Sequence, residues 1–137
     1  MQNKRKTILV VDDDADILKA LSLRLRSSGF NVLTAPDGTF ALALAGSAKP
    51  DLVITDIWMS LGVGFSLAYR LKQTMPEVPF IFLTASKKAE LRKMAEQLGA
   101  AAFLEKPYEP ESLLAAVRAA LQLPDPAIHD DSKSTAA

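Results

Sequence analysis

Five short apolar runs, each followed by a segment with helical spacing of its apolar residues, are the feature that most constrains the fold of this chain. The rhythm repeats about every 25 residues. The apolar runs cover residues 8–11, 31–34, 52–55, 80–83 and 102–104. The segments with helical spacing cover residues 17–28, 39–45, 65–73, 87–98 and 111–121. This alternation predicts five β-strands and five helices in βα order.

The apolar runs also indicate how the sheet is covered. Three of them are continuously apolar rather than alternating, as expected for strands with helices on both faces. Gly29 and Gly99 stand where a helix would end in a left-handed residue, and Pro110 suits the first turn of the last helix. Right-handed crossovers then predict an α/β fold, a doubly wound parallel (βα)5 sheet, with its ligand crevice at the carboxyl ends of the strands.

The length of the chain leaves room for one folded domain. A chain of 137 residues buries roughly two-thirds of its unfolded surface. We expect a basic extension over residues 1–6, a domain over residues 7–122, and a flexible tail or truncated linker over residues 123–137. Because no helix-turn-helix fits after Leu121, we expect any output to come from surface contacts or from a further domain.

Charge and cysteine content exclude several classes of function. Sixteen Lys and Arg residues balance sixteen Asp and Glu residues, so no basic excess indicates direct binding of nucleic acid. The chain has no cysteine, which rules out disulfides, thiolate metal sites and thiol catalysis. The short run between the basic start and Asp12 is too small for a signal-peptide core or a membrane span. We therefore expect a cytoplasmic protein without membrane insertion.

Polar side chains stand at the carboxyl ends of four predicted strands. They are Asp12, Asp13 and Asp14 after the first strand, Asp56 after the third, Thr84 after the fourth and Lys106 after the fifth. Converging carboxylates repel one another, and a fold tolerates them where a hard cation neutralises them. Mg²⁺ suits this set, because it takes one or two carboxylates together with water and phosphate oxygens. The strand ends therefore predict a Mg²⁺ site open to a phosphoryl group.

The remaining groups at these ends suit phosphoryl transfer. Lys106 supplies a flexible positive charge and Thr84 a hydroxyl group, and such groups hold the oxygens of a phosphoryl group in transfer. Asp56 is the candidate nucleophile, since a carboxylate accepts a phosphoryl group directly as an acyl phosphate. This transfer requires positioning and charge neutralisation but no general base.

These residues resemble the receiver (CheY-like) domain of bacterial two-component response regulators over about residues 6–122. The strings that match are ILVVDDD, DLVITDIWM, FIFLTAS and FLEKPY, in the order and at the spacing of the family. The resemblance implies a flavodoxin-like sheet with strand order 2-1-3-4-5. It also implies a signalling switch that promotes its own phosphorylation and slow dephosphorylation, rather than an enzyme that turns over a substrate.

The resemblance assigns the site residue by residue. Asp56 is the implied phosphoacceptor, Lys106 the residue that pairs with the phosphate, and Thr84 the switch hydroxyl. The implied cofactor is Mg²⁺. Its implied ligands are Asp12, Asp13, Asp56 and the backbone carbonyl of Trp58.

The resemblance also implies how the switch is read. Phe103 is the implied switch aromatic residue, and the Lys106–Pro107 peptide bond is implied to be cis. The implied phosphoryl donor is a sensor histidine kinase or a phosphotransfer protein. The implied receiver of the signal is a downstream protein or a missing output domain that contacts the fourth helix, the fifth strand and the last helix. Small residues in the last helix, at Ala115, Ala116, Ala119 and Ala120, suggest a homodimer contact.

One loop departs from the pattern of the family and keeps a second function open. The family commonly has Met-Pro and then an acid-Gly pair after the phosphoacceptor strand, whereas residues 59–64 read MSLGVG. The second function is that of a pseudo-receiver, which acts only as a docking scaffold. A phosphatase with its nucleophile on the first strand is disfavoured because no acidic pair follows Lys106 at a strand end. Flavin binding is disfavoured because acids occupy the place of the phosphate loop.

Overall fold

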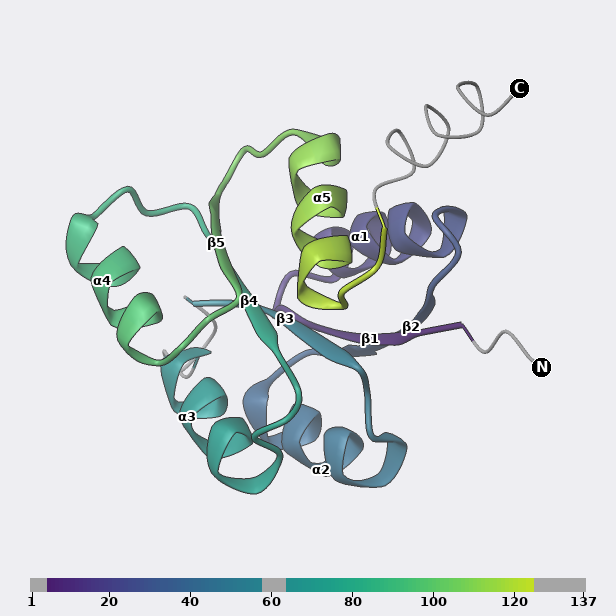
Figure 1. The fold of residues 1–137 in the computed structure, drawn as a ribbon, viewed down its shortest axis with the longest axis horizontal. Coiled ribbons are helices and arrows are strands. Elements are labelled where there is room, and N and C mark those ends of the chain that lie inside the picture. The colour runs from purple at the N-terminus through teal and green to yellow at the C-terminus, as the bar shows by residue number, and fades with distance from the viewer. Residues whose placement is uncertain (1–4, 58–63, 125–137) are drawn as a thin grey trace.

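The computed structural model describes residues 5–57 and 64–124, which form a parallel sheet with helices on both faces (Figure 1). The strands are β1 (Thr7–Val11), β2 (Asn31–Ala35), β3 (Leu52–Asp56), β4 (Phe80–Thr84) and β5 (Ala102–Glu105). They lie in the order β2-β1-β3-β4-β5, and every neighbouring pair is parallel. The predicted doubly wound α/β fold and its strand order are confirmed.

Helices connect the strands and cover the two faces of the sheet. They are α1 (Ala15–Ser27), α2 (Gly38–Ala48), α3 (Gly64–Thr74), α4 (Ala89–Gln97) and α5 (Pro110–Ala120). The helices α1 and α5 pack on one face, and α2, α3 and α4 pack on the other (Figure 1). Within the described residues, no helix is both long and apolar enough to span a bilayer.

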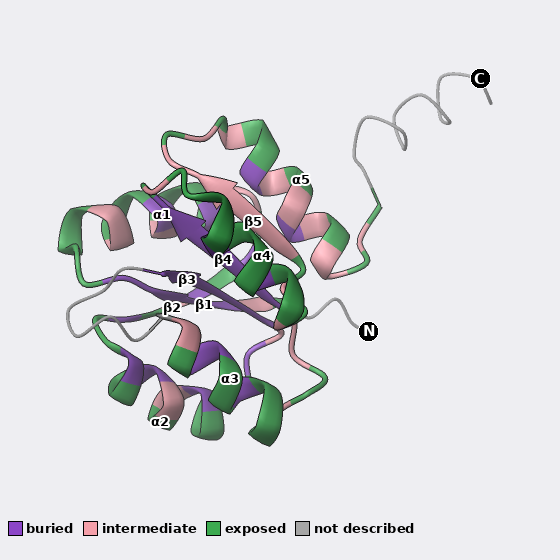
Figure 2. Ribbon diagram, turned by 90° about the vertical axis from the view of Figure 1, so that its left-hand side faces the viewer, coloured by how far each residue is buried: buried purple, intermediate pink, exposed green. Residues whose placement is uncertain are grey.

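Each face of the sheet carries its own hydrophobic core. Because successive side chains of a strand point to opposite faces, Ile8 and Val10 pack beneath α1 and α5, whereas Leu9 and Val11 pack beneath the other three helices. Figure 2 shows the result, with the central strands β3 and β4 buried between helices whose outer sides are exposed, and the edge strand β5 only partly buried. Burial on both faces explains the continuously apolar runs, and it leaves the ends of the strands for polar side chains.

A capping aspartate, two glycines and a proline set several of the helix ends. Asp14 caps α1, since its Oδ1 accepts hydrogen bonds from the backbone N–H groups of Asp16 at 2.9 Å and Ile17 at 3.3 Å. Gly29 and Gly99, with φ of 98° and 82°, end the turns after α1 and α4 in the left-handed region that glycine tolerates. Pro110 is the first residue of α5, as predicted.

Three helices differ from the prediction by more than one residue at one end, and the first of them, α1, begins at Ala15 rather than 17. The helix α2 covers Gly38–Ala48 rather than 39–45, because small residues continue it until Lys49 takes a left-handed φ of 52°. The helix α4 begins at Ala89 rather than 87. Lys88 is extended there, and its backbone N–H donates to Oγ of Ser86 at 3.3 Å instead of joining the helix.

Candidate functional site

Asp12, Asp56 and Thr84 lie at the carboxyl ends of three adjacent strands. Asp12 directly follows β1, and the other two are the last residues of β3 and β4. The register places them side by side, because the residue before Asp12 pairs with the residue before Asp56, and Asp56 pairs with the residue before Thr84. All three are buried, and Asp12 is only 2% and Asp56 8% exposed. The predicted convergence of the strand ends is therefore present.

Lys106 joins the two buried carboxylates. It follows β5, and its backbone N–H donates to the carbonyl oxygen of Thr84 at 2.7 Å. Its Nζ lies 2.9 Å from Oδ2 of Asp56 and 3.4 Å from Oδ2 of Asp12. The Lys106 side chain is 18% exposed, so solvent screens these pairs less than it would at the surface. The Lys106–Pro107 peptide bond is cis.

The protonation of Asp12 and Lys106 reflects their burial and their contact. Burial raises the pKa of Asp12 above its ordinary value, although the backbone N–H of Asp14 and the charge of Lys106 act to lower it. Burial acts to lower the pKa of Lys106, but the hydrogen bond and charge of Asp56, together with those of Asp12, raise it above its ordinary value. The site thus holds a firmly charged ammonium group beside a carboxylate whose charge is disfavoured.

Asp13 and the backbone carbonyl of Trp58 are the other predicted metal ligands. Asp13 is exposed, and Trp58 and residues 59–63 lie outside the described residues. Over residues 5–57 and 64–124, no three His, Cys, Asp or Glu side chains are arranged to hold one ion. Mg²⁺ takes only one or two protein carboxylates with water and phosphate oxygens, so Asp12 and Asp56 fit its donor chemistry. The assignment of metal ligands stays a prediction.

The side chain of Thr84 connects the site to the start of α4. Its Oγ1 accepts a hydrogen bond from the backbone N–H of Ser86 at 3.0 Å. Oγ of Ser86 in turn accepts the backbone N–H of Lys88, the residue before α4, at 3.3 Å. A movement of the Thr84 side chain that breaks this hydrogen bond would therefore leave the turn before α4 without it.

Four residues on β5, on α4 and in the loop before α4 form a cluster, which we call the Glu105 cluster, that sequence reasoning missed. Its members are Lys87, Arg92, Phe103 and Glu105. Both cations lie 3.6 Å from a carboxylate oxygen of Glu105, and the Arg92 guanidinium stands 4.7 Å from the ring centroid of half-buried Phe103. Glu105 pairs with Thr84 in the sheet and directly precedes Lys106. A charged residue in the last position of an apolar strand singles out Glu105, but no sequence pattern indicates its partners.

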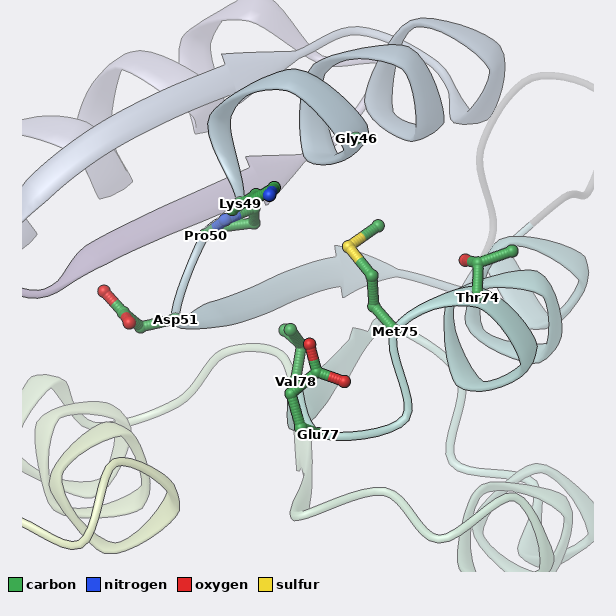
Figure 3. A pocket seen from close by; sticks show the side chains of 8 residues that line it. All are labelled: Gly46, Lys49, Pro50, Asp51, Thr74, Met75, Glu77 and Val78. Atoms are coloured by element: carbon green, nitrogen blue, oxygen red, sulfur yellow. The ribbon is translucent and has the colours of Figure 1, made fainter.

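The opposite edge of the sheet carries a hollow of about 580 Å³ (Figure 3). It lies between the loop from α2 to β3 and the loop from α3 to β4, where Lys49, Asp51 and Glu77 give it charges of both signs. The carboxylate of Asp51 has a structural task, since its Oδ2 accepts the backbone N–H of Thr7 at 2.8 Å. Open α/β sheets bind ligands at the carboxyl ends of their strands, so we assign the site to the other edge.

The alanine residues of α5 divide between core and surface. Ala116 and Ala120 are half-buried against the core beneath α5, whereas Ala115 and Ala119 are exposed. Only half of the small residues that suggested a homodimer contact are therefore open to solvent.

Comparison with known proteins places this arrangement in a family. Residues 8–118 match the family model of the response regulator receiver domain. The transcriptional regulatory protein GlrR of Escherichia coli K12 is 38% identical over 127 residues, which are 93% of this chain and 29% of GlrR. The chain spans about half the length, or less, of the curated relatives it matches.

Solved receiver domains have the same fold. The chemotaxis protein CheY4 of Vibrio cholerae has a TM-score of 0.80 and 31% identity, covering 85% of this chain and 99% of CheY4. The BeF3-activated receiver domain of DrrB has a TM-score of 0.78 and 31% identity, covering 87% of this chain and 99% of that domain. This chain belongs to the response regulator receiver domain family, the signalling switches of two-component systems.

Proposed function

We propose that this chain, over residues 7–122, is a phosphorylatable switch whose Asp56 accepts a phosphoryl group from a sensor histidine kinase or a phosphotransfer protein. The observation that carries the proposal is the position of Lys106, whose Nζ lies 2.9 Å from Asp56 and 3.4 Å from Asp12. Two buried carboxylates and one ammonium group, brought together at the strand ends of a receiver fold, are the groups that phosphoryl transfer to aspartate requires. The proposed location is the cytoplasm.

In the proposed step, a carboxylate oxygen of Asp56 attacks the phosphorus of a phosphohistidine. The P–O bond to Asp56 forms as the P–N bond breaks, and the electron pair of that bond returns to the imidazole nitrogen, which takes up a proton. Lys106 is placed to hold a phosphoryl oxygen through its ammonium group, because its Nζ already contacts Asp56. Its raised pKa keeps the ammonium group charged during transfer.

We infer that Asp12, Asp13 and Asp56, with the backbone carbonyl of Trp58, hold Mg²⁺. The support for this set is electrostatic, since burial raises the pKa of Asp12 and a divalent cation would relieve that disfavoured charge. When bound, Mg²⁺ supplies positive charge to the phosphoryl oxygens beside the negative carboxylates. Asp56 would then carry the phosphoryl group while the carboxylates of Asp12 and Asp13 bind the metal.

The output of the switch is proposed to run through Thr84 to the surface formed by α4, β5 and α5. If the Thr84 hydroxyl turns to a phosphoryl oxygen on Asp56, the Ser86 N–H loses its acceptor and the turn before α4 must rearrange. Phe103 belongs to the Glu105 cluster on this surface, and Glu105 pairs with Thr84. The proposed binding partner of this surface is a downstream protein or a linked output domain. The second alternative is supported by relatives such as GlrR, which extend well beyond the matched region.

The fluorescence of Trp58 tests this function directly, because it is the chain's single tryptophan and lies two residues after Asp56. We expect a saturable change on addition of Mg²⁺ and a second change on addition of beryllofluoride. Asp56→Asn should lose the second change, while Asp16→Asn, a carboxylate in the first turn of α1, should keep both.

The opposite outcome points to the pseudo-receiver. A protein whose fluorescence responds to neither reagent, and that gains no phosphoryl mass with acetyl phosphate, would contradict a phosphoacceptor. The function would then lie in whatever protein the domain docks.

A further inference from the structure

The outer face of α2 is uncharged and largely apolar, with the hydroxyls of Thr39 and Ser47 as its polar side chains. None of the residues Gly38–Ala48 carries a charge. Phe40, Ala43, Leu44 and Ser47 follow one another at the i, i+3, i+4, i+7 spacing of a helix face and line one shallow surface hollow. Phe40 is 53% exposed. A helix that is apolar on all sides is typical of one covered on all sides, yet this face of α2 meets solvent in the single chain.

The uncharged face is particular to α2. Every other helix in the described part of the chain carries charged side chains, from Asp16 and Lys19 in α1 to Glu111 and Arg118 in α5. Leu23 of α1 is even more exposed than Phe40, at 62%, but its neighbour Arg24 is charged. Exposed apolar side chains are ordinary on a surface, whereas a whole helix without a charge is not.

Charges of opposite sign stand at the two ends of α2. Asp37 is the N-cap, whose Oδ1 accepts the backbone N–H of Phe40 at 2.8 Å, and Lys49 is the C-cap. Both are exposed. If two copies of α2 packed antiparallel, Asp37 of each copy would face Lys49 of the other, since both helices have the same length. The dipoles of the two antiparallel helices would also attract each other, because the positive end of each lies beside the negative end of the other.

We propose that α2 is the contact face of a homodimer, in which the α2 helices of two copies pack antiparallel about a two-fold axis. A two-fold contact sets a surface against itself, and an uncharged helix face meets its own copy without repulsion. The small side chain of Ala43, midway between Asp37 and Lys49, allows the helices to approach closely at the axis. This inference is independent of the phosphoacceptor, because α2 contributes no residue to the site.

The dimer should be weak. One pair of 11-residue helices buries less than the roughly 1,200 Å² of a standard stable interface, so we expect a Kd on the order of 100 µM. Sedimentation velocity of the full chain from about 10 µM to about 1 mM covers this range. Phe40→Glu should raise the Kd at least tenfold, because each glutamate would then be buried against the uncharged face of the partner helix. Leu23→Glu, the matched control on α1, should leave it unchanged.

A disulfide test identifies the face itself and avoids a destabilising charge. The chain has no cysteine, so a single Ala43→Cys variant presents one thiol on each copy, and that thiol lies near the proposed axis. We expect it to form a covalent dimer under mild oxidation at least tenfold faster than Ala119→Cys, an exposed position on α5. A chain that stays monomeric throughout the range, or an Ala119→Cys dimer that forms as fast, would overturn the proposal.

Discussion

The two edges of the sheet carry similar side chains and differ in what surrounds them. At the carboxyl edge, Asp56 and Asp12 are buried and share one ammonium group, that of Lys106. At the amino edge, Lys49 and Asp51 line an open hollow, and the Asp51 carboxylate accepts the N–H of Thr7. The first arrangement concentrates negative charge away from water, whereas the second satisfies one carboxylate locally and leaves the cation in solvent.

The difference shows that residue type alone does not identify a site. Aspartate and lysine occur at both edges, and at the carboxyl edge burial raises the pKa of Asp12. Strongly perturbed carboxylates cluster at functional sites. Matched substitutions at the two edges of the sheet therefore test which edge carries the function.

The largest expected effect is on the rate of phosphorylation when Lys106 is replaced, with Lys49 as the matched control at the other edge. Lys106→Ala removes the ammonium group that contacts Asp56, and we expect the rate of phosphorylation by acetyl phosphate to fall about 100-fold to 1,000-fold. Lys49→Asn keeps a residue that tolerates the left-handed backbone at that position and should leave the rate unchanged. Rates measured by phosphate-affinity electrophoresis check both. Equal rates in Lys106→Ala and the wild type would show that the contact has no role in transfer.

Replacing Asp12 and replacing Asp51 should change the free energy of unfolding in opposite directions. Without metal, we expect Asp12→Asn to raise the free energy of unfolding by about 1 kcal/mol, because it removes a disfavoured buried charge. Asp51→Asn should lower it by about 0.5 kcal/mol, because a neutral amide is a weaker acceptor for the Thr7 N–H. Urea unfolding at neutral pH measures both.

The pH dependence of the stability follows from the direction in which the pKa of Asp12 is shifted. Because the folded pKa of Asp12 lies above its unfolded value, the unfavourable charge is present at neutral pH and disappears as the pH falls through the folded pKa. The advantage of Asp12→Asn should therefore shrink on acidification. An advantage that grew as the pH fell would show that the Asp12 charge stabilises the metal-free fold.

An effect as small as that of Asp51→Asn is expected at the Glu105 cluster beside the site. Arg92 and Glu105 have side chains that are 49% and 35% exposed, so their ion pair is largely screened. We expect Arg92→Gln to lower the free energy of unfolding by about 0.5 kcal/mol through loss of the ion pair and of the contact with the Phe103 ring. Lys93→Gln, on the same helix, should have no effect. A double-mutant cycle with Glu105→Gln measures the coupling between Arg92 and Glu105. Zero coupling would show that their ion pair does not stabilise the fold.

The strands and most helix ends could be predicted from the sequence because each depends on local residues. Continuous apolar runs mark strands buried on both faces, and Gly29, Gly99 and Pro110 mark helix ends by their backbone preferences. The end of α2 could not be predicted in this way. Small residues after Ala45 carry no periodic signal, although they continue the helix to Ala48.

The candidate site was predictable to a similar extent. In a parallel sheet the residues after each strand meet at one edge, so Asp12, Asp56 and Lys106 had to converge once the strands were assigned. The Glu105 cluster could not be predicted, because Arg92 reaches Glu105 and Phe103 only through side-chain conformations fixed by the packing of α4 beside β5. Contacts between elements depend on packing that no local pattern encodes.

The most direct test of the central claim is the intact mass of the full chain after incubation with acetyl phosphate and Mg²⁺. We expect the mass of one phosphoryl group on the wild type and on Asp51→Asn, and no added mass on Asp56→Asn. Phosphorylation that persisted in Asp56→Asn would contradict the assignment of the phosphoacceptor, and a wild-type protein that gained no mass would contradict the proposed function itself.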